Sequence, residues 1–165
     1  MHSIRITRRH LPFALAIGTV LLFSVLWVVG WPREAAEHTF PGEQGFVAAV
    51  IDGDTIELAD GRRVRLIGID TPEIGDCYAS EATARIRELL LGRTVRLVRD
   101  VSAVDPYGRA LRYVYIEDTF VNHVLVAEGY ARSIFIRPDT AQYSELRIAQ
   151  EEARDAGRGL WSVCR

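Results

Sequence analysis

Residues 52–73 read DGDTIELADGRRVRLIGIDTPE, with an acidic cluster at each end and arginines between them, of which Arg65 is nearest the second cluster. Asp60-Gly61 is typical of a tight hairpin turn, so residues 55–58 and 63–69 are predicted to pair as strands. The pairing would bring the two acidic clusters close to each other and to Arg65. Hard oxygen ligands, a spare carboxylate and a guanidinium in one place suit a divalent cation held against a phosphodiester.

The segments that follow and precede this hairpin predict the rest of a small barrel. β-prone apolar runs predict further strands at 46–51, 94–99 and 111–116. Apolar residues at helical spacing predict helices at 80–91, 120–128 and 141–156, the first with Ser80 as its N-cap. Five short strands with a helix between the third and fourth predict an α+β, mainly β protein built on a five-stranded OB-fold barrel with three helices.

The N-terminal part of the chain is predicted to be a membrane anchor and a linker. Residues 1–10 form a basic flank with three arginines, and residues 11–31 carry no charge. A helix of that length spans about 31 Å, close to the ~30 Å hydrocarbon core, so one N-terminal transmembrane helix is predicted. Residues 32–44 are interpreted as a linker, and residues 45–165 as the catalytic domain.

The charges around the apolar segment predict its orientation. Three arginines precede the segment and one arginine follows it closely, which places the N-terminus inside and the domain on the outer side of the cell membrane. The alternative is a cleaved signal peptide and a secreted protein, although such peptides usually have an apolar run of about 7–15 residues.

The charge balance limits how the chain can meet nucleic acid. The formal net charge is −2, and from Gln44 onward 16 arginines stand against 19 acidic residues, a net of −3. Such a domain has no general basic field to attract nucleic acid. This argues against a tight nucleic-acid binder, but not against an enzyme that contacts phosphate through a local arrangement.

The acidic residues of the hairpin are candidate ligands for a hard cation. The carboxylates of Asp54 and Asp70, with a carbonyl and waters, suit Ca²⁺ or, less well, Mg²⁺. The four histidines are scattered, so no His/Cys cluster favours a softer metal. Glu73 is a third acid, a candidate general base or water-orienting group. The alternative is that these residues only form turns, for which Asp-Gly pairs are common.

Two arginines are candidates for binding phosphate. Arg65 lies between the acidic clusters, and Arg109 follows a Pro-Tyr-Gly turn. Guanidinium groups bind phosphate oxygens and stabilise the charge that builds up in phosphoryl transfer. The alternative is that each arginine only pairs with a nearby aspartate, and spacing along the sequence leaves both interpretations open.

Four motifs together resemble the staphylococcal nuclease (thermonuclease) family. They are VIDGDT at 50–55, RLIGIDTPE at 65–73, DPYGR at 105–109 and GLWS at 159–162. The resemblance covers about residues 45–162. It implies an OB-fold nuclease domain, a Ca²⁺-dependent endonuclease activity on DNA or RNA, and 3′-phosphate products.

The resemblance also implies roles for individual metal-site residues. Asp54, Asp70 and the backbone carbonyl of Thr71 would hold Ca²⁺. Asp52 would orient these ligands without binding the ion itself.

Catalytic and substrate roles follow from the same resemblance. Glu73 would be the general base or water-orienting residue, Arg65 and Arg109 would contact the scissile phosphate, and Tyr107 would contact the substrate. The segment 134–137 reads Ile-Phe-Ile-Arg where the best-known member stacks bases on tyrosines, a departure that concerns base stacking. Pro106 stands where that member has a lysine, and with the net negative charge of the domain this implies weaker or differently directed substrate binding.

The redox state of the two cysteines depends on the compartment in which the domain lies. Cys77 follows the 70–73 motif and Cys164 is next to last, so they would be free thiols in a cytosolic protein and a disulfide in an exported one. The predicted placement outside the cytoplasm favours the disulfide.

Two other functions compete with a nuclease. A non-catalytic nucleic-acid or protein binding module of this fold typically lacks the acidic and arginine positions, all of which this chain has. A purely structural surface domain is the third possibility. Nucleic acid is the predicted partner, with the membrane contacted through residues 11–31, and no protein partner is predicted.

Overall fold

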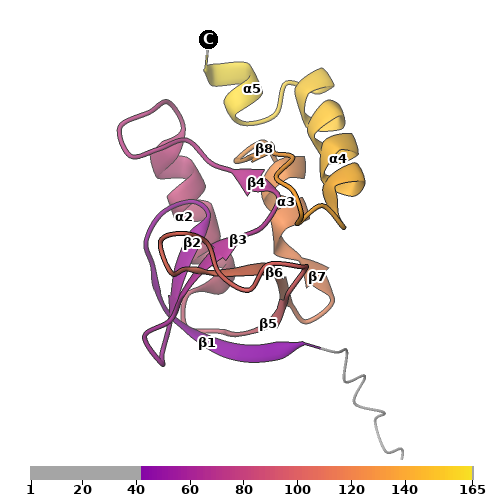
Figure 1. Ribbon diagram of the computed structural model, residues 1–165. Coiled ribbons are helices and arrows are strands. Elements are labelled where there is room, and N and C mark those ends of the chain that lie inside the picture. Colours follow the sequence, from indigo (N-terminus) through magenta and orange to yellow (C-terminus); the bar gives the residue numbers. More distant parts are fainter. Residues whose placement is uncertain (1–41, 165) are drawn as a thin grey trace, which may run out of the picture. The chain divides into compact units, whose positions relative to one another are not determined.

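The structure is a computed structural model that describes residues 42–164. Six strands form one sheet in the order β3-β2-β1-β5-β6-β7, and a parallel pairing of β3 with β6 closes five of them into a barrel (Figure 1). The strands are β1 (Glu43–Val50), β2 (Thr55–Leu58), β3 (Arg63–Leu66), β5 (Thr94–Val98), β6 (Ala110–Ile116) and β7 (Thr119–Phe120). The predicted OB-type barrel is confirmed.

The β2–β3 hairpin forms as the Asp60-Gly61 turn predicts. Its register places Thr55 opposite Arg65 and Ile56 opposite Val64. Because side chains alternate between the two faces of a strand, Ile56 and Val64 share the buried face of the barrel.

The third strand is shorter than predicted. Strand β3 ends at Leu66, because Gly68 takes a left-handed conformation with φ of 75° and breaks the extended run. The chain then forms β4 (Ile69–Asp70), which pairs antiparallel with β8 (Arg132–Ser133) in a separate two-stranded sheet. Neither short strand was predicted, because each is too short for an alternating pattern.

Among residues 42–164 four helices accompany the barrel, one more than the three predicted for the domain. They are α2 (Ala79–Leu90), α3 (Val121–Ala127), α4 (Tyr143–Asp155) and α5 (Leu160–Val163). Helix α3 packs against β6 and against α4 (Figure 1). The N-cap prediction for Ser80 is wrong: Tyr78 caps α2 without a side-chain hydrogen bond, and the Ser80 hydroxyl donates to Glu81.

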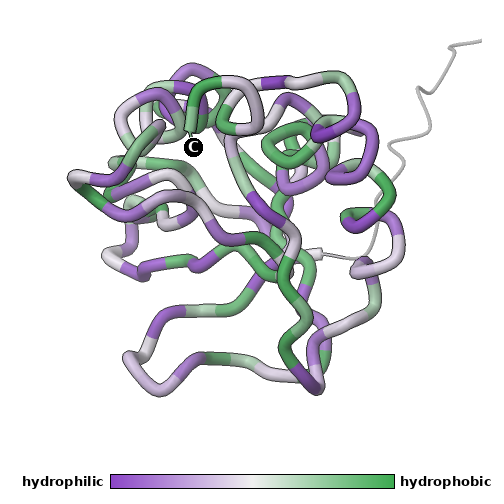
Figure 2. Tube along the Cα trace, turned by 90° about the horizontal axis from the view of Figure 1, so that it is seen from above, coloured by the Kyte–Doolittle hydropathy of each residue, from purple (hydrophilic) through white to green (hydrophobic). Residues whose placement is uncertain are grey.

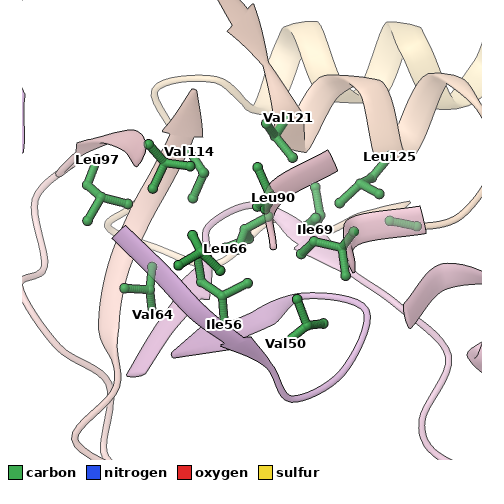
Figure 3. Close-up of a cluster of buried hydrophobic side chains, with 14 of the residues drawn as sticks. Val50, Ile56, Val64, Leu66, Ile69, Leu90, Leu97, Val114, Val121 and Leu125 are labelled. Carbon is green, nitrogen blue, oxygen red and sulfur yellow. The ribbon is translucent and has the colours of Figure 1, made fainter. Parts of the chain in front are cut away.

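The core lies where the strands meet helices α2 and α3. Hydrophobic and hydrophilic residues interleave along the strands and helices (Figure 2). Leu90 from α2 and Val121 and Leu125 from α3 belong to the same buried cluster as Leu66 and Val114 of the barrel (Figure 3). The barrel is therefore filled by side chains and offers the substrate only its outer surface.

A disulfide joins Cys77 to Cys164, with Cα atoms 5.8 Å apart. The predicted pairing is therefore present in the structure. It ties the loop after β4 to the end of α5, the helix in which the described part of the chain finishes.

The predicted N-terminal anchor lies outside the described residues, as do the basic flank and most of the linker. Within residues 42–164, no helix has the length and apolar character that crossing a membrane requires. Strand β1 begins at Glu43, so the last two residues assigned to the linker belong to the barrel.

Candidate active site

Asp54 lies in the turn between β1 and β2 and is buried, with 6% of its surface exposed. Its Oδ2 accepts hydrogen bonds from the backbone nitrogen and the hydroxyl of Thr71, each at 3.0 Å. Asp52 orients the turn, since its Oδ1 accepts a hydrogen bond of 3.1 Å from the Asp54 backbone nitrogen. The two acidic motifs at the ends of the hairpin are thus in direct contact.

Gly53 makes this contact possible. A Cβ atom at this position would lie 2.7 Å from the Thr71 hydroxyl oxygen and 2.8 Å from the Thr71 Cβ, closer than real side chains approach. The glycine in the DGD motif therefore has a packing role that its turn-forming tendency alone did not indicate.

Arg65 lies between the two candidate metal-binding carboxylates. Its Nη1 is 2.9 Å from Asp54 Oδ2, and its Nη2 is 3.2 Å from Asp70 Oδ1. Nη1 also donates to the carbonyls of Leu66 and Ile69, which fixes the guanidinium plane. The structure therefore pairs Arg65 with aspartates, and those aspartates are the ones assigned to the metal.

The electrostatics of Asp54 follow from its burial. Burial raises the pKa of the Asp54 carboxyl to about 6, although the Arg65 guanidinium and the hydrogen bonds from Thr71 oppose the rise. The Arg65 guanidinium, which also pairs with Asp70, does not fully offset the cost of burying the charged form of Asp54.

Arg109 joins the site through Thr55 and is held by Asp105. The Thr55 hydroxyl donates to Asp54 Oδ1 at 3.2 Å and accepts from Arg109 Nη1 at 3.4 Å. Asp105 Oδ2 lies 2.6 Å from Arg109 Nε, while its Oδ1 accepts from the backbone nitrogens of Tyr107 and Arg109. The parallel β3–β6 pairing sets this contact, since it brings Arg109, the residue just before β6, to the hairpin.

Sequence reasoning missed the roles of Asp105 and Thr55. The signal for Asp105 was available, because an Asp followed by Pro-Tyr-Gly favours a turn stabilised by the Asp side chain. Thr55 gave no such signal, because its partner Arg109 is 54 residues away.

Two cavities adjoin at Arg109 and Tyr107, whose side chains line both. The smaller, of about 410 Å³, also contains Arg65 and Asp70. The larger, of about 840 Å³, also contains Glu73. Within residues 42–164 the exposed Glu73 carboxylate has no hydrogen-bond or ion-pair partner. Glu73 thus shares a cavity with Arg109, and its carboxylate is available to bind a water molecule.

The segment 134–137 borders the smaller cavity. Ile134 and Ile136 line it, whereas the ring of Phe135 packs edge-to-face on Tyr143, with centroids 4.9 Å apart. This part of the wall therefore consists of two aliphatic side chains and Arg137, and Tyr107 supplies the aromatic surface.

The donor set suits a hard cation. Asp54, Asp70 and Thr71 provide only oxygen atoms, which Ca²⁺ and Mg²⁺ prefer and soft metals do not. Among residues 42–164 no group of three His, Cys, Asp or Glu side chains is arranged to hold a metal, so a backbone oxygen and waters would have to complete the coordination. Arg65 pairs with both carboxylates, so a cation bound by Asp54 and Asp70 would share them with this guanidinium.

Comparisons with known proteins show which family the chain resembles along most of its length. A family profile described as "Staphylococcal nuclease homologue" matches residues 63–163. A thermonuclease from Staphylococcus intermedius is 37% identical over 166 residues, covering 95% of this chain and 98% of the relative. A thermonuclease from Staphylococcus hyicus is 32% identical, covering 90% and 94%. A protein named micrococcal nuclease from Shigella flexneri is 34% identical, covering 90% and 87%.

Proposed function

Because the chain belongs to the staphylococcal nuclease family, we propose that it is a Ca²⁺-dependent endonuclease that hydrolyses DNA, RNA or both and leaves 3′-phosphate products. The family and its named nucleases make the chain a hydrolase of nucleic-acid ester bonds. The metal, the products and the location of the enzyme go beyond this family assignment and belong to the proposal. The observation that carries the proposal is the continuous set of contacts from Asp70 through Arg65, Asp54 and Thr55 to Arg109.

The two arginines bind the scissile phosphate in this mechanism. Arg65 and Arg109 line the same cavity, and each has its guanidinium fixed by an aspartate. Fixed guanidinium groups stabilise the charge that develops on phosphate oxygens as the nucleophile attacks, and they need little reorganisation to do so.

Glu73 is the general base or water-orienting residue for the attacking water. Its exposed carboxylate lines the cavity shared with Arg109, and it can orient a water molecule and accept its proton. The proton then has a path to solvent, because this cavity is open.

Asp54, Asp70 and the Thr71 carbonyl would hold Ca²⁺, supported by Asp52. A bound Ca²⁺ supplies Lewis-acid stabilisation of phosphate charge. Thr71 lies close to Asp54, an approach that the absence of a side chain at Gly53 permits, and this closeness supports the ligand set.

We further propose that the domain lies on the outer side of the cytoplasmic membrane, anchored by residues 11–31. The uncharged length of this segment and the arginines before it support the anchor, and the Cys77–Cys164 pair suits an oxidising compartment. Secretion after cleavage of the segment is the alternative. N-terminal sequencing of the mature protein from its membrane fraction tests the anchor, and a mature N-terminus beyond residue 31 would contradict it.

The activity is tested with the purified chain and single-stranded DNA, double-stranded DNA and RNA. Cleavage is expected with Ca²⁺, to weaken with Mg²⁺ and to stop with a chelator. The products are expected to resist extension by a polymerase until a phosphatase removes the 3′-phosphate. Binding without cleavage under every metal condition would instead support the non-catalytic binding module.

A further inference from the structure

The larger cavity extends well beyond the residues used in the mechanism. It runs from Arg109 over the surface of β3 and β6, and arginines dominate its polar wall. Those arginines are Arg62, Arg63, Arg109 and Arg112. The domain has a net negative charge, so this concentration of guanidinium groups beside the site is a local feature of the surface.

Arg63 is the most available of these groups. Its side chain is 60% exposed, and its one ion pair is a 3.4 Å contact from Nε to Glu57. Among the described residues, both terminal nitrogens of Arg63 lack a partner. Such a group can bind a phosphate without first losing a strong contact.

Glu43 restrains two further arginines of the cavity. Its carboxylate pairs with Arg62 through one oxygen and lies 3.4 Å from Arg112 Nη2 through the other. The hydrogen bond from Arg62 holds the pKa of the Glu43 carboxyl below its usual range, so the carboxylate is charged at neutral pH. Arg112 is 13% exposed and is fixed by the carbonyls of Ala103 and Leu111, which leaves its guanidinium in the cavity wall.

An aromatic ring stands where the two cavities meet. Tyr107 is 84% exposed, and the Arg109 guanidinium carbon lies 5.5 Å from the centre of its ring. A positively charged groove beside an exposed aromatic ring is how proteins bind a single nucleic-acid strand without reading its sequence.

We propose that the larger cavity is a subsite for the nucleotides of a single nucleic-acid strand next to the scissile phosphate, with Arg63 and Arg112 binding its phosphates and Glu43 limiting its affinity. The inference rests on the proposed nuclease function and adds a direction to it. The strand enters along β3 and β6, crosses Arg109 and leaves through the smaller cavity. Substrates that extend into the larger cavity are therefore bound more tightly than short ones.

The test compares charge variants in a binding assay that requires no turnover. The probe is a fluorescent, phosphorothioate-linked oligothymidylate that keeps its charge and resists hydrolysis, with a dinucleotide as the short competitor. Arg63→Gln is expected to weaken binding of the long probe about 3- to 10-fold and to reduce the slope of log affinity against log salt by about 0.7, the value for one lost phosphate contact. Glu43→Gln is expected to tighten binding of the long probe and to steepen that slope.

Two matched variants control for net charge. Arg147 and Glu151 pair on α4, and their side chains line neither cavity. Arg147→Gln and Glu151→Gln change the net charge by the same amounts and are expected to leave the preference for the long probe unchanged.

The outcomes separate this inference from the nuclease function. If Arg63→Gln and Glu43→Gln behave like their α4 counterparts, the subsite is overturned, whether or not the chain cleaves DNA. Tighter binding by Glu43→Gln cannot come from misfolding, so it would support the subsite even if Arg63→Gln proved unstable. A chain that binds as proposed but cleaves nothing would keep the groove and lose the catalytic proposal.

Discussion

The carboxylate of Asp105 holds the guanidinium of Arg109, with 2.6 Å between Oδ2 and Nε. The same carboxylate accepts a hydrogen bond from the backbone nitrogen of Arg109, so it fixes both the main chain and the guanidinium of this arginine. Asp105 is therefore a positioning residue for a group that we assign to the scissile phosphate.

Replacing Asp105 by asparagine is expected to lower kcat/KM. A hydrogen bond to a charged group contributes about 1.5–3 kcal/mol, which corresponds to about 10- to 150-fold in rate. Steady-state kinetics on single-stranded DNA measures the loss. A positioning role further predicts that Asp105→Glu recovers part of kcat, whereas equal losses in both variants, matched by equal losses of thermal stability, would indicate a purely structural residue.

Gly53→Ala is expected to disturb both stability and the response to metal. The added methyl group would press on the Thr71 side chain that hydrogen-bonds Asp54, and such overpacking costs about 1–3 kcal/mol. Denaturant unfolding measures the stability, and a calcium titration of activity measures the site. Gly61→Ala is the control for the calcium response: its left-handed φ of 83° makes the substitution strained, but its methyl would meet no atom, so it lowers stability without pressing on the site. Equal effects of the two variants on calcium response would remove the proposed role of Gly53.

Loss of the Cys77–Cys164 disulfide is expected to destabilise the domain strongly. The bond closes a loop with a sequence separation of 87, and the entropic model gives about 4–5 kcal/mol for a loop of that size. Unfolding of the native protein with and without reductant measures the effect, and the double variant Cys77→Ser, Cys164→Ser should not respond to reductant. A native protein that is equally stable in both conditions would show that the bond does not contribute.

Asp139 predicts a pH dependence of stability. Its Oδ1 accepts hydrogen bonds from the backbone nitrogens of Val101 and Ser102, at 2.9 and 2.7 Å. Burial raises the pKa of this carboxyl, but the Ser102 side chain together with these two backbone hydrogen bonds outweighs burial and holds the pKa below its usual value. The stabilisation is therefore fully present above the pKa of the unfolded state, about 3.9, and is lost as the pH falls through the folded-state pKa.

The variant Asp139→Asn tests this sign. It is expected to be less stable than the native protein by about 1–2 kcal/mol at neutral pH. The difference between the two should shrink as the pH falls below about 4, because the native carboxyl then becomes neutral as well. A difference that stays constant from neutral to acid pH would show that the charge of Asp139 has no part in stability.

The hairpin could be predicted from sequence because its signals are local. Asp60-Gly61 sets the turn, and the observed strand Thr55–Leu58 has the predicted bounds. The contact between Arg65 and both aspartates follows from this hairpin, since all three residues belong to one short stretch. The local pattern therefore predicts that Arg65 lies beside the two aspartates. It does not decide whether those aspartates bind a metal or only pair with the arginine.

The other half of the site depends on contacts that no local pattern encodes. Arg109 reaches Thr55 through the parallel pairing of β3 with β6, which joins segments about 45 residues apart. Helix α5 has only four residues, and its first backbone nitrogen, from Leu160, donates to the carbonyl of Gly129. The motif resemblance supplied Arg109 as a candidate, and only the folded chain shows that it meets Thr55.

The central claim is that Asp54 and Asp70 hold a calcium ion beside two arginines that bind the scissile phosphate. Its most direct test is the calcium dependence of DNA hydrolysis by the native chain and by Asp70→Asn. We expect native activity to saturate with Ca²⁺, to disappear in chelator and to return when Ca²⁺ is restored, and Asp70→Asn to require about 10-fold or more Ca²⁺ for half-maximal activity. Undiminished hydrolysis by the native chain in chelator, or an unchanged calcium requirement in Asp70→Asn, would rule out this calcium site.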